Sequence, residues 1–206
     1  MDTMTEHEAM RTEAVVPIAY HQFFITEEGE APTGLPATTN GLADLANPNA
    51  VVVRTGIHTG PVAVILEARA DPPHTDWAWD EIVEVSVTVE SGALYVSALM
   101  ADVDPQPPPL TPTGHCTYRI RIHARGRDLD IDATTDTILE TYLLQAWPDD
   151  VTPTDILKQT DRYGQMLRGT SLHRETHPEI DARQSSAEEN RLKLLRDTLL
   201  RQARGE

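Results

Sequence analysis

One acidic loop carries the residues best suited to bind another protein. The loop is DPPHTDWAWDE, residues 71–81, where four carboxylates surround two tryptophans. An aromatic side chain rimmed by carboxylates suits a positively charged partner, because the ring fills a pocket and the charges steer the encounter. Two alternatives stay open: a tryptophan that closes one end of a β-domain, and paired carboxylates of a glycosidase or metal site. The predicted binding residues are Asp76, Trp79, Asp80 and Glu81.

A stripe of cations follows in CTYRIRIHARGRD, residues 116–128, although the whole chain has a net charge of -16. Residues at every second position share one face of a strand. The cations of this stripe are Arg119, Arg121, His123 and Arg125. We expect them to pair with acids of a neighbouring strand such as Glu84 or Glu90; the alternative is a docking face for an anion or for a second copy. Nucleic acid is disfavoured, because Tyr118 points to the opposite face and nucleic-acid-binding domains are usually basic.

The sequence contains no recognisable catalytic or metal-binding motif. The histidines of the β-rich part lack the short spacings of zinc sites, and Cys116 has no obvious base beside it. There is no G-x-S-x-G element, and TGIHTG, residues 55–60, lacks the lysine and the following helix of a phosphate-binding loop. We therefore expect no catalytic residue, no metal and no cofactor, and we predict that the protein is not an enzyme. An enzymatic interpretation would rest only on the numbers of histidines and carboxylates.

The charge is unevenly distributed along the 206 residues. Residues 1–118 contain three basic and 17 acidic residues, a net charge of -14, whereas residues 119–206 carry -2. The first part should attract basic partners and repel nucleic acid and anionic membranes; solubility is the alternative explanation. The sequence shows no signal-peptide pattern, no apolar run of about 20 residues and no partner for Cys116. We expect a cytoplasmic protein that binds neither membranes nor nucleic acid directly.

Short β-branched segments separated by turn-rich loops must position these residues. We expect seven or eight strands between Val15 and Trp147, with the clearest alternation in EIVEVSVTV, residues 81–89. A long loop is expected over residues 29–50. The predicted fold is mainly β, a single β-sandwich or jelly-roll-like domain over residues 15–148 with a C-terminal helical extension. Residues 1–14 are expected to form a flexible N-terminus, and residues 149–206 a helical tail with a linker.

The tail contains two segments with helical patterns. PTDILKQTDRYGQMLRG, residues 153–169, predicts a short helix that begins near Thr154 or Asp155 and ends near Gly169. SSAEENRLKLLRDTLLRQARGE, residues 185–206, predicts an amphipathic helix with basic residues on its polar sides. This second helix could dock on the acidic domain of another copy. A structural or assembly protein that forms a homo-oligomer is therefore the alternative function.

Three β segments carry a family resemblance: IAYHQFFI (residues 18–25), EIVEVSVTVESGALYVSAL (residues 81–99) and LTPTGHCTYRIRI (residues 110–122). They resemble, in that order, the opening strand, the central hairpin and a turn into a strand of the competence protein J family, small bacterial inhibitors of a DNA-entry nuclease. The resemblance covers Ile18 to about Pro148, and the helical tail has no counterpart. It implies a non-enzymatic protein that binds a basic nuclease or toxin, with carboxylates in place of nucleic-acid phosphates. No functional residue of that family is carried over to this sequence.

Overall fold

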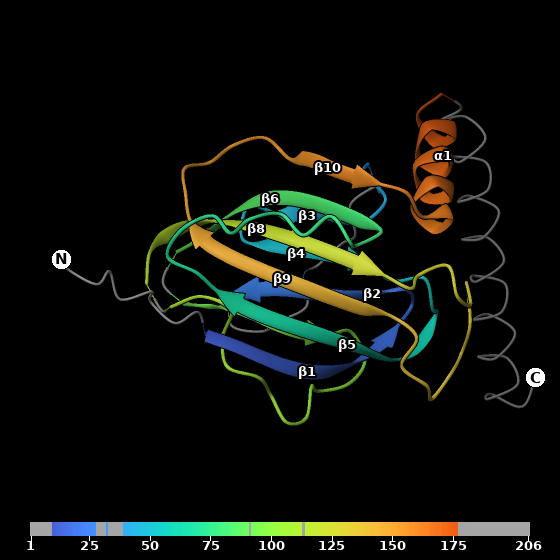
Figure 1. The fold of residues 1–206 in the computed structure, drawn as a ribbon, viewed down its shortest axis with the longest axis horizontal. Coiled ribbons are helices and arrows are strands. Elements are labelled where there is room, and N and C mark those ends of the chain that lie inside the picture. The colour runs from blue at the N-terminus through green and yellow to red at the C-terminus, as the bar shows by residue number, and fades with distance from the viewer. Residues whose placement is uncertain (1–9, 28–31, 33–38, 91, 113, 177–206) are drawn as a thin grey trace, which may run out of the picture. The chain divides into compact units, whose positions relative to one another are not determined.

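The computed structural model describes residues 10–27, 32, 39–90, 92–112 and 114–176 (Figure 1). The fold is mainly β, as predicted, because ten strands precede one α-helix within these residues. The strands are β1 (Met10–Ala19), β2 (Gln22–Glu27), β3 (Ala43–Asn47), β4 (Ala50–Arg54), β5 (Thr59–Ala68), β6 (Glu81–Val89), β7 (Leu94–Ala98), β8 (Cys116–Arg125), β9 (Thr141–Pro148) and β10 (Asp155–Gln159), and the helix is α1 (Arg162–Thr176).

The ten strands form one sheet that folds back on itself into two layers (Figure 1). The first layer has the order β10-β6-β8-β9-β5-β1, and the second contains β7, β2, β4 and β3. The layers join at the β1–β2 hairpin, which has one register pair, Ala19 with Gln22. β5 and β9 are parallel, and the other paired strands are antiparallel. This curled, sandwich-like sheet encloses one main hydrophobic core.

The core lies between the layers and follows from the alternation of the strands. Val83, Val85 and Val87 of β6 are fully buried and belong to the same cluster as Phe23 and Ile25 of β2. Burying a side chain of this size contributes about 1.5–3 kcal/mol. Because one face of each central strand supplies the core, the opposite face of the first layer carries polar residues.

Several element boundaries differ from the sequence predictions. Residues 10–14, expected in a flexible N-terminus, belong to β1 and pair with β5. Ala43–Asn47 forms β3 where a loop was expected, and β7 pairs with β2 rather than with β6, so residues 81–99 are not a hairpin. Alternation identifies the buried face of a strand but does not name its neighbour.

The segment after β9 differs most from its prediction. Asp155–Gln159 is not the start of a helix but the edge strand β10, which pairs with β6. The helix α1 begins only after Asp161, whose Oδ1 accepts a hydrogen bond from Gly164 N (2.8 Å), the usual bond of an N-cap residue.

The chain divides into two compact units, residues 1–168 and 169–206. The amphipathic helix predicted over residues 185–206 lies outside the described residues, so assembly through it stays a prediction. In the described part of the chain, no helix is long and apolar enough to cross a membrane.

Candidate functional site

The basic stripe lies on the outer face of the first layer, and its arginines pair internally. Arg119 Nε donates to Glu84 Oε2 (3.1 Å), and Arg121 Nε donates to Glu84 Oε1 (2.6 Å). One carboxylate of β6 therefore serves two arginines of β8. The predicted pairing across strands is confirmed for Glu84, which lies opposite Arg121 in the strand register.

Two loops cover Arg119 and Arg121 of this stripe and remove them from solvent, whereas Arg125 is exposed. In the loop 71–80, Pro73 O accepts a hydrogen bond from Arg121 Nη1 (2.8 Å). In the loop 149–154, Pro153 O accepts one from Arg119 Nη1 (3.0 Å). His123 is fully buried beside them, and burial lowers its pKa to about 4, so the ring is neutral near pH 7. The two arginines and the histidine are therefore part of the fold rather than an open anion-binding face.

Of the four predicted binding residues, Asp76 and Trp79 form one local unit. Asp76 is exposed, and its Oδ2 accepts a hydrogen bond from Trp79 Nε1 (3.1 Å). The Trp79 ring is buried against Ile82 and Leu143 on the outer face of the sheet, as expected of a large aromatic side chain that packs within the fold. The exposed aromatic residue of this loop is instead Trp77, with 59% of its surface accessible.

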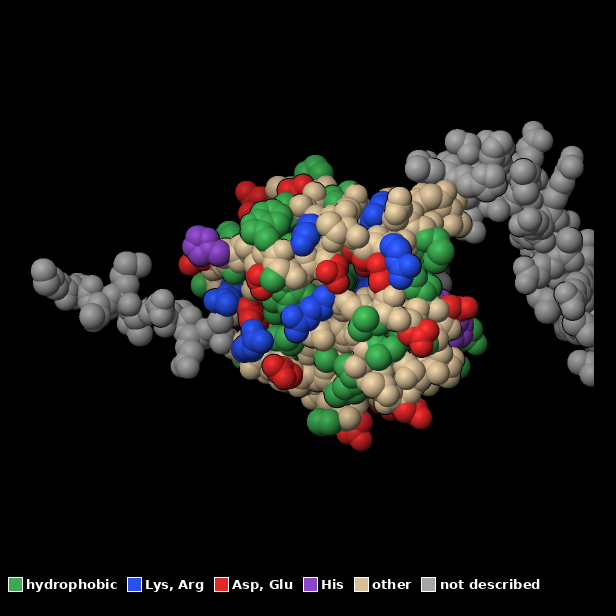
Figure 2. All heavy atoms as spheres, turned by 45° about the vertical axis from the view of Figure 1, so that its right-hand side comes forward, with side chains coloured by type: hydrophobic (Ala, Val, Ile, Leu, Met, Phe, Trp, Pro, Cys, Tyr) green, Lys and Arg blue, Asp and Glu red, His purple; other side chains and the backbone are tan. Residues whose placement is uncertain are grey.

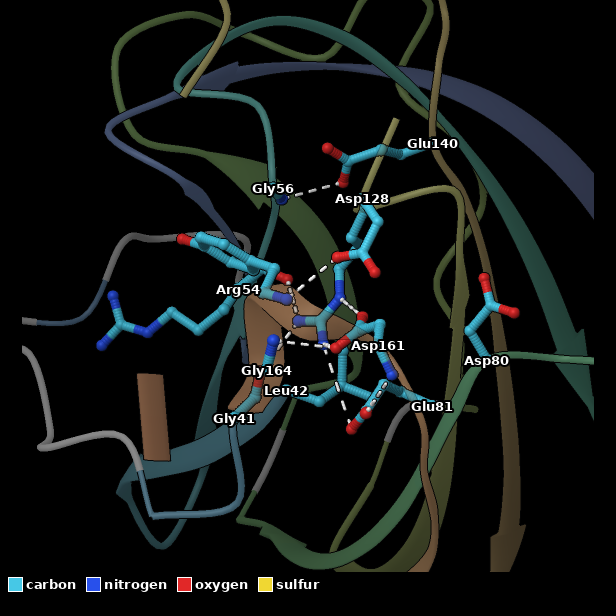
Figure 3. A network of polar contacts seen from close by, with 12 residues as sticks. Gly41, Leu42, Arg54, Gly56, Asp80, Glu81, Asp128, Glu140, Asp161 and Gly164 are labelled. Atoms are coloured by element: carbon cyan, nitrogen blue, oxygen red, sulfur yellow. Dashed lines mark hydrogen bonds and ion pairs between the residues drawn. The ribbon is translucent and has the colours of Figure 1, made fainter. Parts of the chain in front are cut away.

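Asp80 and Glu81 lie where β6 begins and point in different directions (Figure 3). Asp80 is half-buried, and its Oδ2 accepts a hydrogen bond from Gly126 N (3.1 Å). Glu81 is fully buried; its Oε1 accepts a bond from Asp161 N (3.1 Å), and its Oε2 lies 3.3 Å from Arg168 Nη1. The structure thus places the four predicted residues together, but only the two aspartates reach the surface. Partner binding by this set stays a prediction.

A buried arginine, Arg127, is the centre of a network of polar contacts (Figure 3). Its Nε and Nη2 donate to the two carboxylate oxygens of Asp161 (2.6 and 2.8 Å), and its Nη1 donates to Gly41 O (2.8 Å). The Tyr163 ring centre lies 5.4 Å from the guanidinium carbon, and Glu81 Oε2 lies 4.0 Å from Nη2. The network therefore joins the segment before β3, the start of β6, the end of β8 and the start of α1.

The exclusion of water changes the protonation of this network. Burial raises the pKa of Glu81 to about 7; the Asp161 carboxylate acts in the same direction, and Arg127 opposes both. Burial disfavours the charged form of Arg127, but Tyr142 and Asp161 outweigh that effect and raise its pKa. Such charge-assisted, bidentate bonds are strong. A buried ion pair nevertheless stabilises a fold only when its geometry is good and further hydrogen bonds satisfy its remaining polar atoms.

A second buried carboxylate, Glu140, lies just before β9. Its two oxygens accept bonds from Gly56 N (3.1 Å) and Ile57 N (2.6 Å), and the Tyr142 hydroxyl donates to it (2.5 Å). Burial raises the pKa of Glu140. A side chain at position 56 would clash, because its Cβ would lie 2.1 Å from Arg127 O. These contacts hold the turn before β5 against the base of β9.

The sequence patterns did not predict the Arg127 network. Gly126 (φ 87°) ends the alternation of β8, and the next side chain leaves the outer face and enters the molecule. Gly126 is the sequence feature that could have indicated an inward-pointing Arg127, because a glycine that ends a strand allows the next residue to leave the face of that strand. Asp161 lies 34 residues further along the chain, and no spacing rule connects it to Arg127.

The polar side chains at this end of the sheet are engaged with one another, which limits their chemistry. Within the ranges that the structure describes, no group of three or more His, Cys, Asp or Glu side chains could hold a metal ion. Carboxylates are the most numerous charged groups at the surface of the described residues.

The exposed charge is predominantly negative. Among the described residues, twelve exposed side chains are carboxylates and four are arginines. Acidic side chains lie along the lower edge and the right-hand side of the face in Figure 2. Burial does not cause this excess, because five carboxylates and three arginines are buried among the described residues.

Comparison with known proteins identifies a shared fold and no family. No family model matches the sequence, and no curated protein matches it. ComJ from Bacillus subtilis, the inhibitor of the DNA degrading activity of NucA, matches in structure with a TM-score of 0.50 and 13% sequence identity, over 68% of this chain and 98% of ComJ. A protein named crocagin biosynthetic gene J matches with a TM-score of 0.42 and 14% identity, over 69% of this chain and 99% of that chain. The chain therefore has a ComJ-like fold.

Proposed function

We propose that this ComJ-like fold serves as a non-enzymatic binding protein that inhibits a basic partner protein, a nuclease or a toxin. The observation that carries the proposal is the structural likeness to ComJ, an inhibitor of a DNA degrading activity, over 98% of that chain. The excess of exposed carboxylates among the described residues supports it, because complementary charge gives fast and selective association with a basic surface.

A nuclease cleft offers a physical reason for the negative charge. Such a cleft must bind phosphate groups, so it is rich in basic side chains. Carboxylates on a rigid scaffold can occupy it and imitate the phosphates without offering a bond to cleave. Asp76 and Asp80 are the predicted binding residues whose carboxylates reach the surface. Trp79 and Glu81 then support this loop from beneath, through the Trp79 bond to Asp76 and through the buried network.

Inhibition of DNA degradation tests the proposal directly. The full chain is titrated into a panel of purified basic nucleases that includes NucA, and the loss of linear DNA is followed. We expect inhibition by the wild type and about tenfold weaker inhibition by the double variant Asp76→Asn, Asp80→Asn, since asparagine keeps a hydrogen-bond acceptor but loses the charge. The matched control is Asp102→Asn with Asp104→Asn, two exposed carboxylates after β7.

Two results would contradict this proposal. If the folded wild type inhibits no nuclease of the panel, the assignment of a nuclease as the inhibited partner is wrong. If the control pair weakens inhibition as much as the loop pair does, net charge alone governs the interaction, and the assignment to Asp76 and Asp80 is wrong.

A further inference from the structure

Three residues with a left-handed backbone meet at one end of the sheet. Tyr20 (φ 56°), His21 (φ 60°) and Asp132 (φ 66°) are the non-glycine residues with positive φ in the described part of the chain. We call them the strained cluster. Residues with a Cβ atom rarely adopt this conformation, because Cβ then approaches a carbonyl oxygen. Such strain persists only where the surrounding structure holds it, and it concentrates at functional sites.

Tyr20 and His21 are the two central residues of the β1–β2 hairpin. Ala19 pairs with Gln22, so the loop has two residues, and both have positive φ, as in a type I′ turn. Asn-Gly is the favoured sequence for this turn, because these residues adopt the conformation with little strain. The turn geometry therefore does not explain a tyrosine at position 20.

His21 has a structural explanation for its strained position. Its Nδ1 lies 3.1 Å from Thr55 O, and its Nε2 lies 3.1 Å from Asp132 Oδ1. Its ring stacks on Tyr163 with centroids 5.7 Å apart, and Tyr163 in turn packs on Arg127. His21 therefore connects the strained cluster to the buried network and fixes the turn.

Tyr20, in contrast, faces solvent. Its exposed fraction is 58%, and its ring forms a T-shaped pair with the His58 ring, with centroids 5.3 Å apart. His58 N and Thr59 N both donate to Ala133 O (2.8 and 3.1 Å), which holds the loop 130–136 beside the turn. The exposed carboxylates of this loop are Asp130, Asp132 and Asp136.

We propose that the strained cluster presents Tyr20, together with the carboxylate of Asp132 that contacts the neighbouring His21, as a binding surface for arginine side chains of a protein partner. The inference rests on the proposed function and adds to Asp76 and Asp80 a second surface with its own binding chemistry. A guanidinium group stacks on an aromatic face and bonds to carboxylates at its edge. A rigidly held tyrosine loses little conformational freedom on binding, which is why tyrosines form the centres of interfaces. Arg127 and Tyr163 make the same pairing inside this fold.

Thermal unfolding separates a binding role of Tyr20 from a structural one. Asparagine tolerates the left-handed conformation, so Tyr20→Asn should relieve strain and raise the Tm by about 2–5 °C. If the substitution raises the Tm, the fold holds Tyr20 in a backbone conformation that tyrosine disfavours. A lower Tm would show that the Tyr20 ring stabilises the fold, and it would overturn the inference.

Binding is measured by NMR titration of the full chain with a peptide of about eight alternating arginine and glycine residues. We expect amide shifts at residues 19–22 and 130–136. Tyr20→Asn and Asp132→Asn should each weaken binding by at least about fivefold; asparagine at 132 keeps the tolerated backbone and an acceptor for His21. The controls are Met100→Ala and Asp102→Asn, both exposed after β7, and these should bind like the wild type. Shifts elsewhere, or no binding, would overturn the inference.

The proposed function and this inference fail separately. If Tyr20→Asn inhibits a nuclease as well as the wild type does, the surface is wrong while the inhibitor function stands. If no nuclease is inhibited but the arginine peptide still binds at residues 19–22 and loses affinity in Tyr20→Asn, the surface is supported while the assignment of a nuclease as the inhibited partner is wrong.

Discussion

Replacing Glu81 by glutamine tests whether the buried network controls stability near neutral pH. Glu81 is fully buried at the start of β6, between Asp161 and the guanidinium groups of Arg127 and Arg168. Glutamine has nearly the same size, and its side-chain oxygen can still accept the bond from Asp161 N, but it does not ionise. The substitution therefore removes one titration with little change in packing.

The expected effect follows from the pKa of Glu81 in the folded and unfolded chain. Burial and the Asp161 carboxylate raise it from an ordinary 4.5 to about 7 in the fold. The folded state thus binds the proton more tightly than the unfolded state does. Its contribution to stability is fully present below about pH 4.5 and is lost as the pH rises through about 7. The difference between these values corresponds to about 3 kcal/mol of unfolding free energy.

Urea unfolding followed by circular dichroism at intervals from pH 5 to pH 8 measures this contribution. As the pH rises across this range, the unfolding free energy of the wild type should fall by up to about 3 kcal/mol more than that of Glu81→Gln. Glu90→Gln, at an exposed carboxylate, is the matched control and should follow the wild type. If the pH dependence of Glu81→Gln equals that of the wild type, Glu81 does not titrate in this range, and the electrostatic account of the network is wrong.

Two further predictions concern the buried arginines. Arg127→Met leaves Asp161 buried without its counter-ion and should lower the urea-derived unfolding free energy by about 3–5 kcal/mol; adding Asp161→Leu should recover part of the loss, and no recovery would contradict the ion-pair account. Reversing Arg119 and Arg121 to glutamate places two new carboxylates beside Glu84 beneath the covering loops, so we expect no folded protein by circular dichroism, whereas Arg119→Lys keeps the charge and should fold. A folded double variant of wild-type stability would refute the role of the stripe.

The sheet and part of its outer face could be predicted because their causes are local in sequence. One buried face imposes a period of two on β6 and β8, and opposite charges on neighbouring strands attract, which was enough to pair the stripe with Glu84. The neighbours of β7 and the existence of β10 depend on the whole fold. DILKQ, residues 155–159, is compatible with a helix, and its pairing with β6 decides the outcome.

The candidate site was predictable to a similar degree and for the same reason. Asp76, Trp79, Asp80 and Glu81 are close in sequence, so their proximity in space was expected. The burial of Glu81 was not, because the groups that surround it come from Arg127 and from α1. The strained turn at Tyr20 was hidden as well, since its sequence is not that of a typical type I′ hairpin.

The late position of β10 in the sequence has a consequence for how the protein is made. A growing chain exposed as far as residue 150 already contains all of the strands β1 to β9. Arg119 still lacks its covering carbonyls from residues 152 and 153, and Arg127 lacks the carboxylate of Asp161. Chains fold progressively from the N-terminus during synthesis, but this one cannot satisfy its buried cations until residue 161 has left the ribosome. The order of translation therefore delays the closure of this end of the sheet until residue 161 is available, after the most acidic part of the chain has been exposed.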